Sequence, residues 1–201
     1  MDLLDVIESG RFVGREFLVW LWFESEVLDG RFELPDPDGG SFDLWFESQL
    51  TLEAQRSEKE KSRLVGAAPS MTSEAHEALR RGKLPTKARI RIERGEQPYG
   101  FVLDAETLSL SGVTLPALMK DDDEERFYER MYLLEQLEAM VDMLYSTFLT
   151  LRLDSSWDDQ VLPVIRDWIH DPEQVPVAKY KKIRASIEPV AANKRATWLP
   201  E

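Results

Sequence analysis

The 201-residue chain has no cysteine and only two histidines. The missing thiols exclude disulfides, thiolate zinc sites and cysteine nucleophiles, and they are typical of proteins from a reducing compartment. No apolar run approaches the roughly 18 residues that a membrane span needs. The first five residues also lack the basic flank of a signal peptide. We therefore expect a cytoplasmic protein that makes no contact with a membrane.

Motifs that mark many enzymes are missing as well. There is no glycine-rich phosphate loop and no G-x-S-x-G elbow, because the glycines cluster only at predicted turns. His76 and His170 lie on separate predicted helices, with no carboxylate or second histidine at ligand spacing. We therefore expect no enzyme, no catalytic residue, no metal and no cofactor. A nuclease remains a third hypothesis, since acids scattered along the chain could assemble a site.

Two acidic segments have simpler interpretations than metal binding. The run from Asp36 to Gly40 begins like a calcium loop but lacks the later ligands, and its residue types favour a turn between strands. The run from Asp121 to Glu125 is contiguous, whereas two-metal sites gather carboxylates from separate elements. At the start of a predicted helix, these acids suit the positive end of the helix dipole.

Charge of one sign dominates the chain, with a formal net charge of -13. Taken alone, this charge opposes the approach of a polyanion such as nucleic acid. The cations are nevertheless concentrated in residues 80–94 and 179–184. Because salt screens charges beyond about 10 Å, a local basic face can outweigh the global sign.

The apolar pattern predicts an α+β fold, with antiparallel strands packed by a long C-terminal helix and an N-terminal aromatic-rich helix. Residues 12–28 have helical periodicity, and Gly30 follows as a stop. Residues 31–54 read as a hairpin with a turn at 35–40 and a bulge near 47–49. The polar segment 55–61 is expected to be a hairpin tip, with 62–65 returning as a strand.

In the second half, we expect a helix over 70–81, a strand over 87–93 and a partner strand over 101–110. Residues 121–152 give the strongest helical signal, and 155–169 predict another helix. The stripe expected to bury the long helix consists of Phe127, Met131, Leu134, Val141, Tyr145 and Phe148. We expect one domain over 1–171, followed by a Pro-punctuated basic tail or docking arm over 172–201.

A strictly alternating strand carries the candidate binding residues. Lys87, Arg89 and Arg91 share one face, and Ala88, Ile90 and Ile92 share the other. Further cations stand just upstream at Arg80, Arg81 and Lys83. The cations form either a solvated sheet face opposite acidic strands or a stripe that contacts phosphates without reading bases.

Aromatic residues concentrate in the first predicted helix, at Phe17, Trp20, Trp22 and Phe23. Such a cluster is more typical of a core or a protein interface than of a platform for stacking bases.

Several short motifs, read in order, carry a resemblance. These are Gly82-Lys83-Leu84-Pro85-Thr86-Lys87 at a strand start, Phe101-Val102-Leu103-Asp104 in a hairpin, and Leu133-Leu134-Glu135-Gln136-Leu137 in the long helix. More loosely, Gly14 to Trp22 and the hairpin from Phe32 to Phe46 fit the same order. The chain thereby resembles, over roughly residues 12–152, the C-terminal half of the RdgC family, the recombination-associated DNA-binding proteins of bacteria.

The resemblance implies non-sequence-specific binding of duplex DNA related to recombination control, in the bacterial nucleoid. Lys83 and Lys87 are the two positions at which the resemblance itself implies DNA contacts. The family's N-terminal portion, which helps close a ring-shaped dimer around the duplex, has no counterpart in this sequence.

Two leading hypotheses follow, and they make different predictions. DNA binding through Arg80, Arg81, Lys83, Lys87, Arg89 and Arg91 predicts a complex with a steep dependence on salt. The alternative is a non-catalytic interaction subunit that docks a protein partner, or forms a homo-oligomer, through its aromatic helix or tail. That subunit predicts a salt-tolerant, apolar interface.

Overall fold

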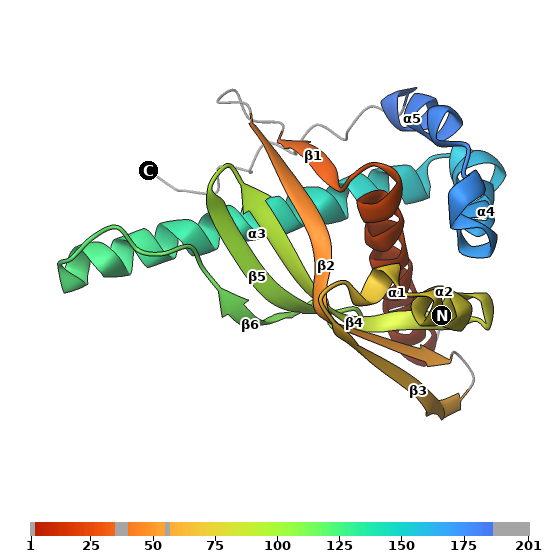
Figure 1. Cartoon of the computed structure of the whole chain (residues 1–201), viewed down its shortest axis with the longest axis horizontal. Coiled ribbons are helices and arrows are strands. Elements are labelled where there is room, and N and C mark those ends of the chain that lie inside the picture. Colours follow the sequence, from red (N-terminus) through yellow and green to blue (C-terminus); the bar gives the residue numbers. More distant parts are fainter. Residues whose placement is uncertain (1–2, 35–39, 55–56, 187–201) are drawn as a thin grey trace.

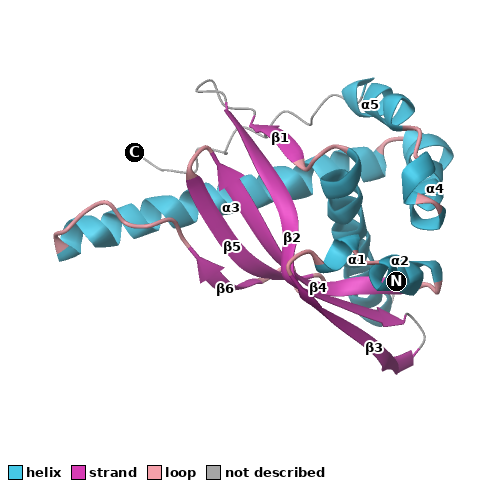
Figure 2. Cartoon of the chain, in the orientation of Figure 1, coloured by secondary structure: helices cyan, strands magenta, loops and turns pink. Residues whose placement is uncertain are grey.

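The computed structural model describes the backbone of residues 3–34, 40–54 and 57–186, and the side chains of 13–34, 40–54 and 60–186. One antiparallel sheet lies in front of the long helix α3 in Figure 1, and the other helices gather at one end of the sheet. Figure 2 distinguishes the strands of this sheet from the helices by colour. The protein therefore has the α+β fold that the sequence predicts.

The sheet of the described residues has six strands. They are β1 (Arg31–Leu34), β2 (Gly40–Ala54), β3 (Ser57–Gly66), β4 (Lys83–Arg94), β5 (Gln97–Asp104) and β6 (Leu110–Thr114). Their order is β1-β2-β4-β5-β6, with β3 paired to β2 at the end away from β1. Every pairing is antiparallel.

The predicted bulge in β2 is confirmed, because the pairing of β2 with β4 shifts between Phe46 and Leu50, and Ser48 has a φ of 54°. Two strand predictions are wrong in extent. The predicted hairpin is present, but its tip is shorter than 55–61, since β3 already begins at Ser57 and pairs with β2. The strand predicted over 101–110 is two strands, because β5 ends at Asp104 and β6 begins at Leu110. Most of the predicted turn at 35–40 lies outside the described residues.

Strand β4 alternates as the sequence predicts. Ala88, Ile90 and Ile92 are completely buried against the helices, whereas Arg89 and Arg91 lie partly exposed on the opposite face. We call this opposite side the outer face of the sheet. Its cations are held outward because every second side chain of a strand points the same way.

Helix α1 (Leu3–Val27) begins nine residues earlier than predicted, and its aromatic cluster is core. Phe17, Trp20, Trp22 and Phe23 are each at most 1% exposed. Every side chain from Phe17 to Phe23 is buried, because β2 and β4 pack against this helix together with α3 and α4. Gly14 permits this close packing, since a Cβ there would stand 1.8 Å from the carbonyl oxygen of Ala105.

Helix α3 (Asp123–Leu153) is unbroken, as predicted. Its buried stripe, however, is Leu133, Leu137, Met140, Leu144, Phe148 and Leu151. The expected burial of Phe127 and Met131 is wrong, because these side chains are 59% and 43% exposed. The reason is visible in Figure 1, where the N-terminal part of α3 extends past the edge of the sheet. No other described element covers it there.

The remaining helices gather around the C-terminal half of α1. Helix α2 (Ser73–Arg80) follows a short turn (Pro69–Met71) and is capped by Thr72, whose hydroxyl oxygen accepts from the amide of Ala75. After a π-turn (Trp157–Val161) come α4 (Leu162–His170), a 3-10 turn (Pro172–Gln174) and α5 (Val177–Ser186). None of the helices within the described ranges is long and apolar enough to cross a membrane.

The prediction of a separate tail does not hold for residues 172–186. Helix α5 packs into the same core as α1, with Tyr180 and Ile183 buried. The indole nitrogen of Trp20 donates to the hydroxyl of Tyr180 at 3.1 Å, and this hydroxyl donates to the buried carboxylate of Glu24. These bonds fasten α5 to α1. The rest of the predicted tail, 187–201, lies outside the described residues.

Candidate functional site

The predicted basic stripe is only partly assembled on the outer face, where Lys87, Arg89 and Arg91 stand together. The ammonium nitrogen of Lys87 lies 2.7 Å from a carboxylate oxygen of Asp104 on β5. The hydrogen bond that Lys87 donates to this carboxylate raises the pKa of Lys87. Partial burial raises the pKa of Asp104, but the bonds from Lys87 and from nearby backbone amides outweigh it and leave that pKa lowered. Lys87 is thus already paired with an anion.

Arg89 acts as a structural brace across the sheet. Its guanidinium donates to the carbonyl of Gly112 at 2.9 Å and to the hydroxyl of Thr114 at 3.1 Å, both on β6. The side chain passes over β5 at Gly100, where a Cβ would stand 2.9 Å from a guanidinium nitrogen. Glycine at that position therefore makes room for the brace.

Arg91 is also paired on the outer face. One guanidinium nitrogen lies 2.6 Å from a carboxylate oxygen of Glu93, and the other lies 3.5 Å from Glu47. The hydrogen bond to Glu93 is the main reason that the pKa of Arg91 is raised. The guanidinium carbon also lies 5.6 Å from the centre of the Trp45 ring, within the range of a cation–π contact.

The three upstream cations lie at the end of α2 and the start of β4. Arg81 lies 3.0 Å from Glu77, and Arg80 lies 3.7 Å from the same carboxylate while donating to the carbonyl of Ile169. The ammonium of Lys83 donates to the hydroxyl of Ser62 at 3.1 Å. Four of the six predicted DNA contacts therefore pair with a carboxylate, and together the six do not form a continuous unpaired cationic surface.

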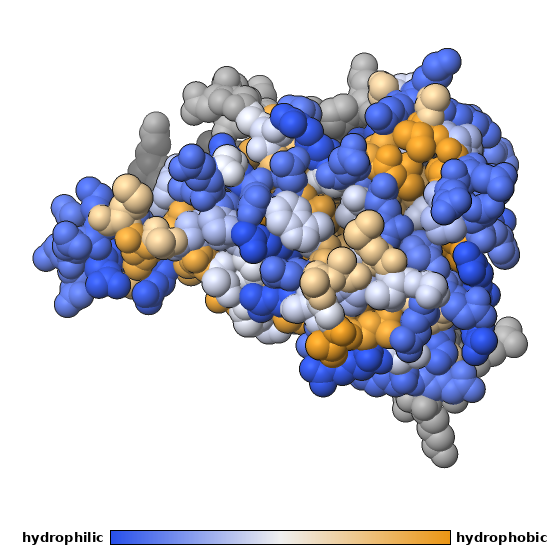
Figure 3. All heavy atoms as spheres, in the orientation of Figure 1, coloured by the Kyte–Doolittle hydropathy of each residue, from blue (hydrophilic) through white to orange (hydrophobic). Residues whose placement is uncertain are grey.

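A second surface was not anticipated from the sequence. We call residues 119–132 the α3 arm, which comprises the end of the connector from β6 and the first turns of α3. Its exposed apolar side chains are Met119, Phe127, Tyr128, Met131 and Tyr132, with exposed fractions from 43% to 87%. In Figure 3 the projecting end at the left of the molecule shows pale and orange atoms among hydrophilic ones.

Hydrogen bonds hold the arm in shape. The carboxylate of Glu129 accepts from the backbone amides of Met119 at 2.9 Å and Lys120 at 3.1 Å, which clamps the connector onto the helix. Asp122 caps α3, because its side chain accepts from the amides of Glu124 and Glu125. The interpretation of the acidic run as a helix start is thus confirmed.

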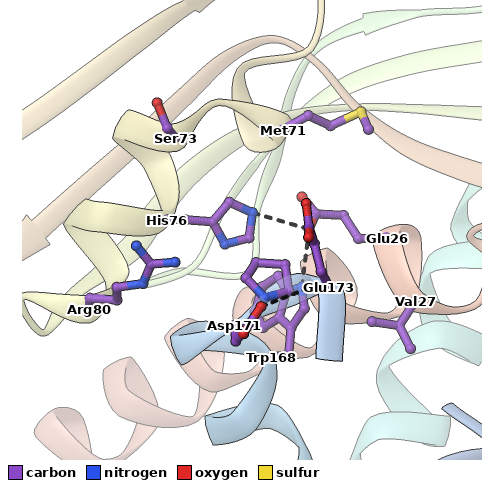
Figure 4. A pocket seen from close by; sticks show the side chains of 10 residues that line it. Glu26, Val27, Met71, Ser73, His76, Arg80, Trp168, Asp171 and Glu173 are labelled. Atoms are coloured by element: carbon purple, nitrogen blue, oxygen red, sulfur yellow. Dashed lines mark hydrogen bonds and ion pairs between the residues drawn. The ribbon is translucent and has the colours of Figure 1, made fainter. Parts of the chain in front are cut away.

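A cavity of about 520 Å³ opens where the end of α1 meets α2 and α4. Figure 4 shows His76 and Trp168 in its wall beside Glu26. The Glu26 carboxylate accepts from Trp22 at 2.6 Å and from Trp168 at 3.1 Å, and Nε2 of His76 lies 3.2 Å from one of its oxygens. The His76 side chain is only 9% exposed, and its Nδ1 has no hydrogen-bond partner among the described residues. We call this the α1–α2–α4 cavity.

Histidine and carboxylate therefore do meet in the fold, although the sequence separates Glu26 from His76 by 50 positions. No signal at short spacing could have shown this contact. Within the part of the chain that the structure describes, no group of three or more His, Cys, Asp or Glu could hold a metal ion. The calcium-loop segment at 36–39 lies outside that part.

No family model, no curated protein and no solved structure matches this chain. The similarity to the RdgC family thus stays a prediction from short motifs.

Proposed function

We propose that the protein is a non-catalytic interaction subunit whose α3 arm docks onto an apolar, cation-rimmed surface of a partner protein. One observation carries the proposal. A single continuous helix buries its apolar stripe from Leu133 onward, yet leaves Phe127, Tyr128, Met131 and Tyr132 in solvent. A contiguous exposed patch of this kind is typical of a protein interaction site.

The α3 arm has three features of a helix that binds a partner protein: it projects from the protein, it is preformed, and it exposes aromatic residues and methionine. At 1.5 Å per residue, the ten residues 123–132 extend α3 by about 15 Å past its buried part. The Asp122 cap and the Glu129 clamp pre-form the helix, which lowers the entropy lost on binding. Aromatic residues and methionine are also the types enriched at the centres of protein interfaces. An amphipathic helix of this kind fits the groove mode of recognition.

The charge of the arm indicates the chemistry of the partner. Six acids surround the apolar patch, against the three cations Lys120, Arg126 and Arg130; the acids are Asp121, Asp122, Asp123, Glu124, Glu125 and Glu129. A second copy would bring arms of the same sign together, on chains that each carry -13. Like charges across an interface oppose association, so a cationic rim on a different protein is the complementary arrangement.

The test uses two synthetic helical peptides of equal length, one of leucine and lysine and one of leucine and glutamate. Calorimetric titration should show that the intact protein binds the leucine–lysine peptide and not its acidic counterpart. Phe127→Gln with Met131→Gln should weaken this binding at least about tenfold, which corresponds to 1.4 kcal/mol.

The matched control is Val65→Thr with Leu153→Gln, which changes two apolar residues that are 74% and 83% exposed elsewhere. It should bind as the parent does. Equal binding by both double variants would contradict the proposal. So would a self-association, seen by sedimentation, that the arm variant abolishes, since a second copy would then be the occupant.

Weak, non-sequence-specific binding of duplex DNA is a second candidate. It is supported by the RdgC resemblance and by the shared outer face of Lys87, Arg89 and Arg91. Binding would require Lys87 and Arg91 to exchange their carboxylate partners for phosphates. We therefore expect affinity only at low salt, in the non-specific range of about 10⁻⁴–10⁻⁶ M.

The DNA test is a titration of labelled duplex at two salt concentrations. Lys83→Glu with Lys87→Glu should flatten the salt dependence, because each phosphate contact contributes a log–log slope of about -0.9. Arg89 is left unchanged, since its loss would also remove the brace to β6. Equal binding by parent and variant, or none by either at low salt, would contradict this candidate.

A further inference from the structure

The cations of helix α5 lack most of the carboxylate partners that neutralise the outer face of the sheet. This helix carries no acid, and its cations are Lys179, Lys181, Lys182 and Arg184. The one ion pair that α5 makes among the described residues joins Arg184 to Glu24. Because distant charges are screened by salt, a chain with a net charge of -13 keeps a local positive surface here.

A cavity of about 490 Å³ lies beside this helix, between α5, the end of α1, β1 and α3. We call it the α1–α5 cavity, and its volume falls within the range of sites for small molecules. Lys181, Arg184 and Ala185 line it from α5, where spacings of three and four residues place them on one side of the helix. Arg31 of β1 adds a third cation, and its side chain is 63% exposed. Cations from two elements thus converge on one cavity.

Arg184 is held in position and still has donors to offer. Its Nε lies 3.3 Å from the buried carboxylate of Glu24, and its guanidinium carbon lies 6.0 Å from the centre of the Trp20 ring. Because a guanidinium is planar, these contacts restrict the direction of its two terminal nitrogens. Within the described residues the terminal nitrogens donate to no acceptor, and neither is among the buried atoms without a partner. The side chain is 29% exposed, so this pair of donors is accessible to a carboxylate, which it can bind in a bidentate manner.

Apolar side chains form much of the remaining wall. They come from α1, β1 and α3, and they are Leu28, Phe32, Leu34 and Met143. An apolar chain placed against them would be removed from water, which is favourable by about 25 cal/mol per Å². The arrangement therefore suits a ligand with an anionic end at α5 and an apolar body between β1 and α3.

The two acids of the cavity do not cancel its positive charge. Glu24 is buried and already accepts from two side chains of α5. Glu33 has a side chain that is 80% exposed and lies 3.9 Å from Arg31. Lys181 is exposed and has no ion pair within the described part of the chain. An anion entering the cavity therefore meets an excess of positive charge.

We propose that the α1–α5 cavity binds a small organic carboxylate that carries an apolar chain. The carboxylate accepts from the terminal nitrogens of Arg184 and from the ammonium of Lys181, and the chain packs on Met143. The site is independent of the α3 arm, which projects from the other end of the molecule (Figure 1).

Other occupants fit less well. A small cation would meet Arg31, Lys181 and Arg184, and the described residues offer no group of three metal ligands. A polyanion lying along α5 would need only exposed positive side chains, so it would contact Lys182 as readily as Lys181. Because Lys182 does not line the cavity, the two lysines distinguish a ligand inside it from a polyanion on the helix surface.

The test uses four probes: octanoate, octylammonium, 1-octanol and acetate. Octylammonium and octanol keep the chain and change the head group, while acetate keeps the head group alone. Binding is followed by ¹³C-methyl NMR of the methionines of the intact protein. Met143 lines the cavity, whereas Met71 is exposed elsewhere and serves as an internal control. Substitution Met143→Leu assigns the reporting signal.

Octanoate should shift the Met143 methyl signal saturably, while Met71 stays unchanged. Octanol should bind at least about fivefold more weakly, and octylammonium and acetate should cause no saturable shift. Lys181→Gln should weaken octanoate binding about two- to fivefold, the size of an exposed ion pair. Lys182→Gln, the same change at the adjacent position outside the cavity, should leave the affinity unchanged.

Three results would overturn the proposal. The first is binding of octanol or octylammonium that is as tight as that of octanoate. The second is an equal loss from Lys181→Gln and Lys182→Gln, which would place the anion on the surface of α5. The third is the absence of any shift of Met143 with octanoate at millimolar concentration.

Discussion

The two halves of α3 belong to one unbroken helix but have opposite surroundings. From Leu133 onward the helix buries its stripe against the body of the protein, whereas its first turns leave Phe127 and Tyr128 about 60% exposed. Apolar side chains in the inner half stabilise the fold, since they are removed from water on folding. The same residue types in the α3 arm contribute almost nothing to folding until something covers them. Apolar periodicity therefore predicts the helix, whereas the surrounding elements determine which of its apolar side chains are buried.

The comparison predicts its largest effect at Phe148. This ring is fully buried, with centroids 5.4 Å from Phe17, 5.7 Å from Trp20 and 5.8 Å from Trp157. Phe148→Ala should lower the free energy of unfolding by about 3–5 kcal/mol, measured by urea denaturation. Phe127→Ala, the matched change in the arm, should stay within about 0.5 kcal/mol. A large loss from Phe127→Ala would erase the distinction between the two halves.

A smaller effect is expected where α5 is fastened to α1. Tyr180→Phe removes the hydroxyl that accepts from Trp20 and donates to Glu24, and it leaves the buried indole N–H of Trp20 without this partner. We expect a loss of about 1–3 kcal/mol in the free energy of unfolding. Tyr128→Phe in the exposed arm removes the same atom and should change nothing. If both substitutions behave alike, the Tyr180 network does not stabilise the fold.

The same network predicts a dependence on pH. Burial is the largest influence on Glu24 and raises its pKa above the ordinary value of 4.5, although Arg184, Tyr180 and Trp20 oppose this. The folded state therefore holds a proton that the unfolded state has already lost. The stability that this group contributes is present at low pH and is lost as pH rises from about 4.5 through the folded pKa, by at most about 1.4 kcal/mol per pH unit.

Glu24→Gln should flatten this decline, measured as urea midpoints across a pH series. Glu138→Gln, the same change at an exposed position of α3, should preserve the parental slope. An unchanged slope in the Glu24 variant would place the pH dependence elsewhere in the molecule.

The smallest effect is expected at the clamp of the arm. Glu129→Gln replaces the carboxylate that accepts from the amides of Met119 and Lys120. Hydrogen exchange at these two amides should accelerate, while global stability changes by less than about 1 kcal/mol. Slow exchange in the variant would show that the connector is held by contacts other than the clamp.

Local patterns were sufficient for some elements and not for others. Strict alternation from Lys87 to Glu93 predicted which side chains lie on each face of β4, because successive side chains of a strand point to opposite faces. Helix α5 was missed because Tyr180 and Ile183 are its only buried residues, too few to give a helical stripe. The stripe chosen for α3 included Phe127 because periodicity along a helix does not reveal where the sheet ends.

The candidate site was less predictable than the fold. The cations were found, but their partners were not, since the acid for Lys87 comes from β5 and the oxygens for Arg89 come from β6. The contact between Glu26 and His76 likewise joins α1 to α2 across the intervening strands. Such pairings depend on strand order and helix placement, neither of which a local pattern specifies.

The hydrogen bond from Trp20 to Tyr180 joins residues 160 positions apart. During synthesis α1 leaves the ribosome before α5, so this part of its aromatic surface stays uncovered until α5 has been translated. Until α5 is translated, the nascent chain therefore exposes apolar surface of α1. Exposed apolar surface of this kind promotes aggregation and is bound by chaperones. A fragment that stops before Val177 would lack Tyr180, which packs on Phe23 and donates to the carboxylate of Glu24.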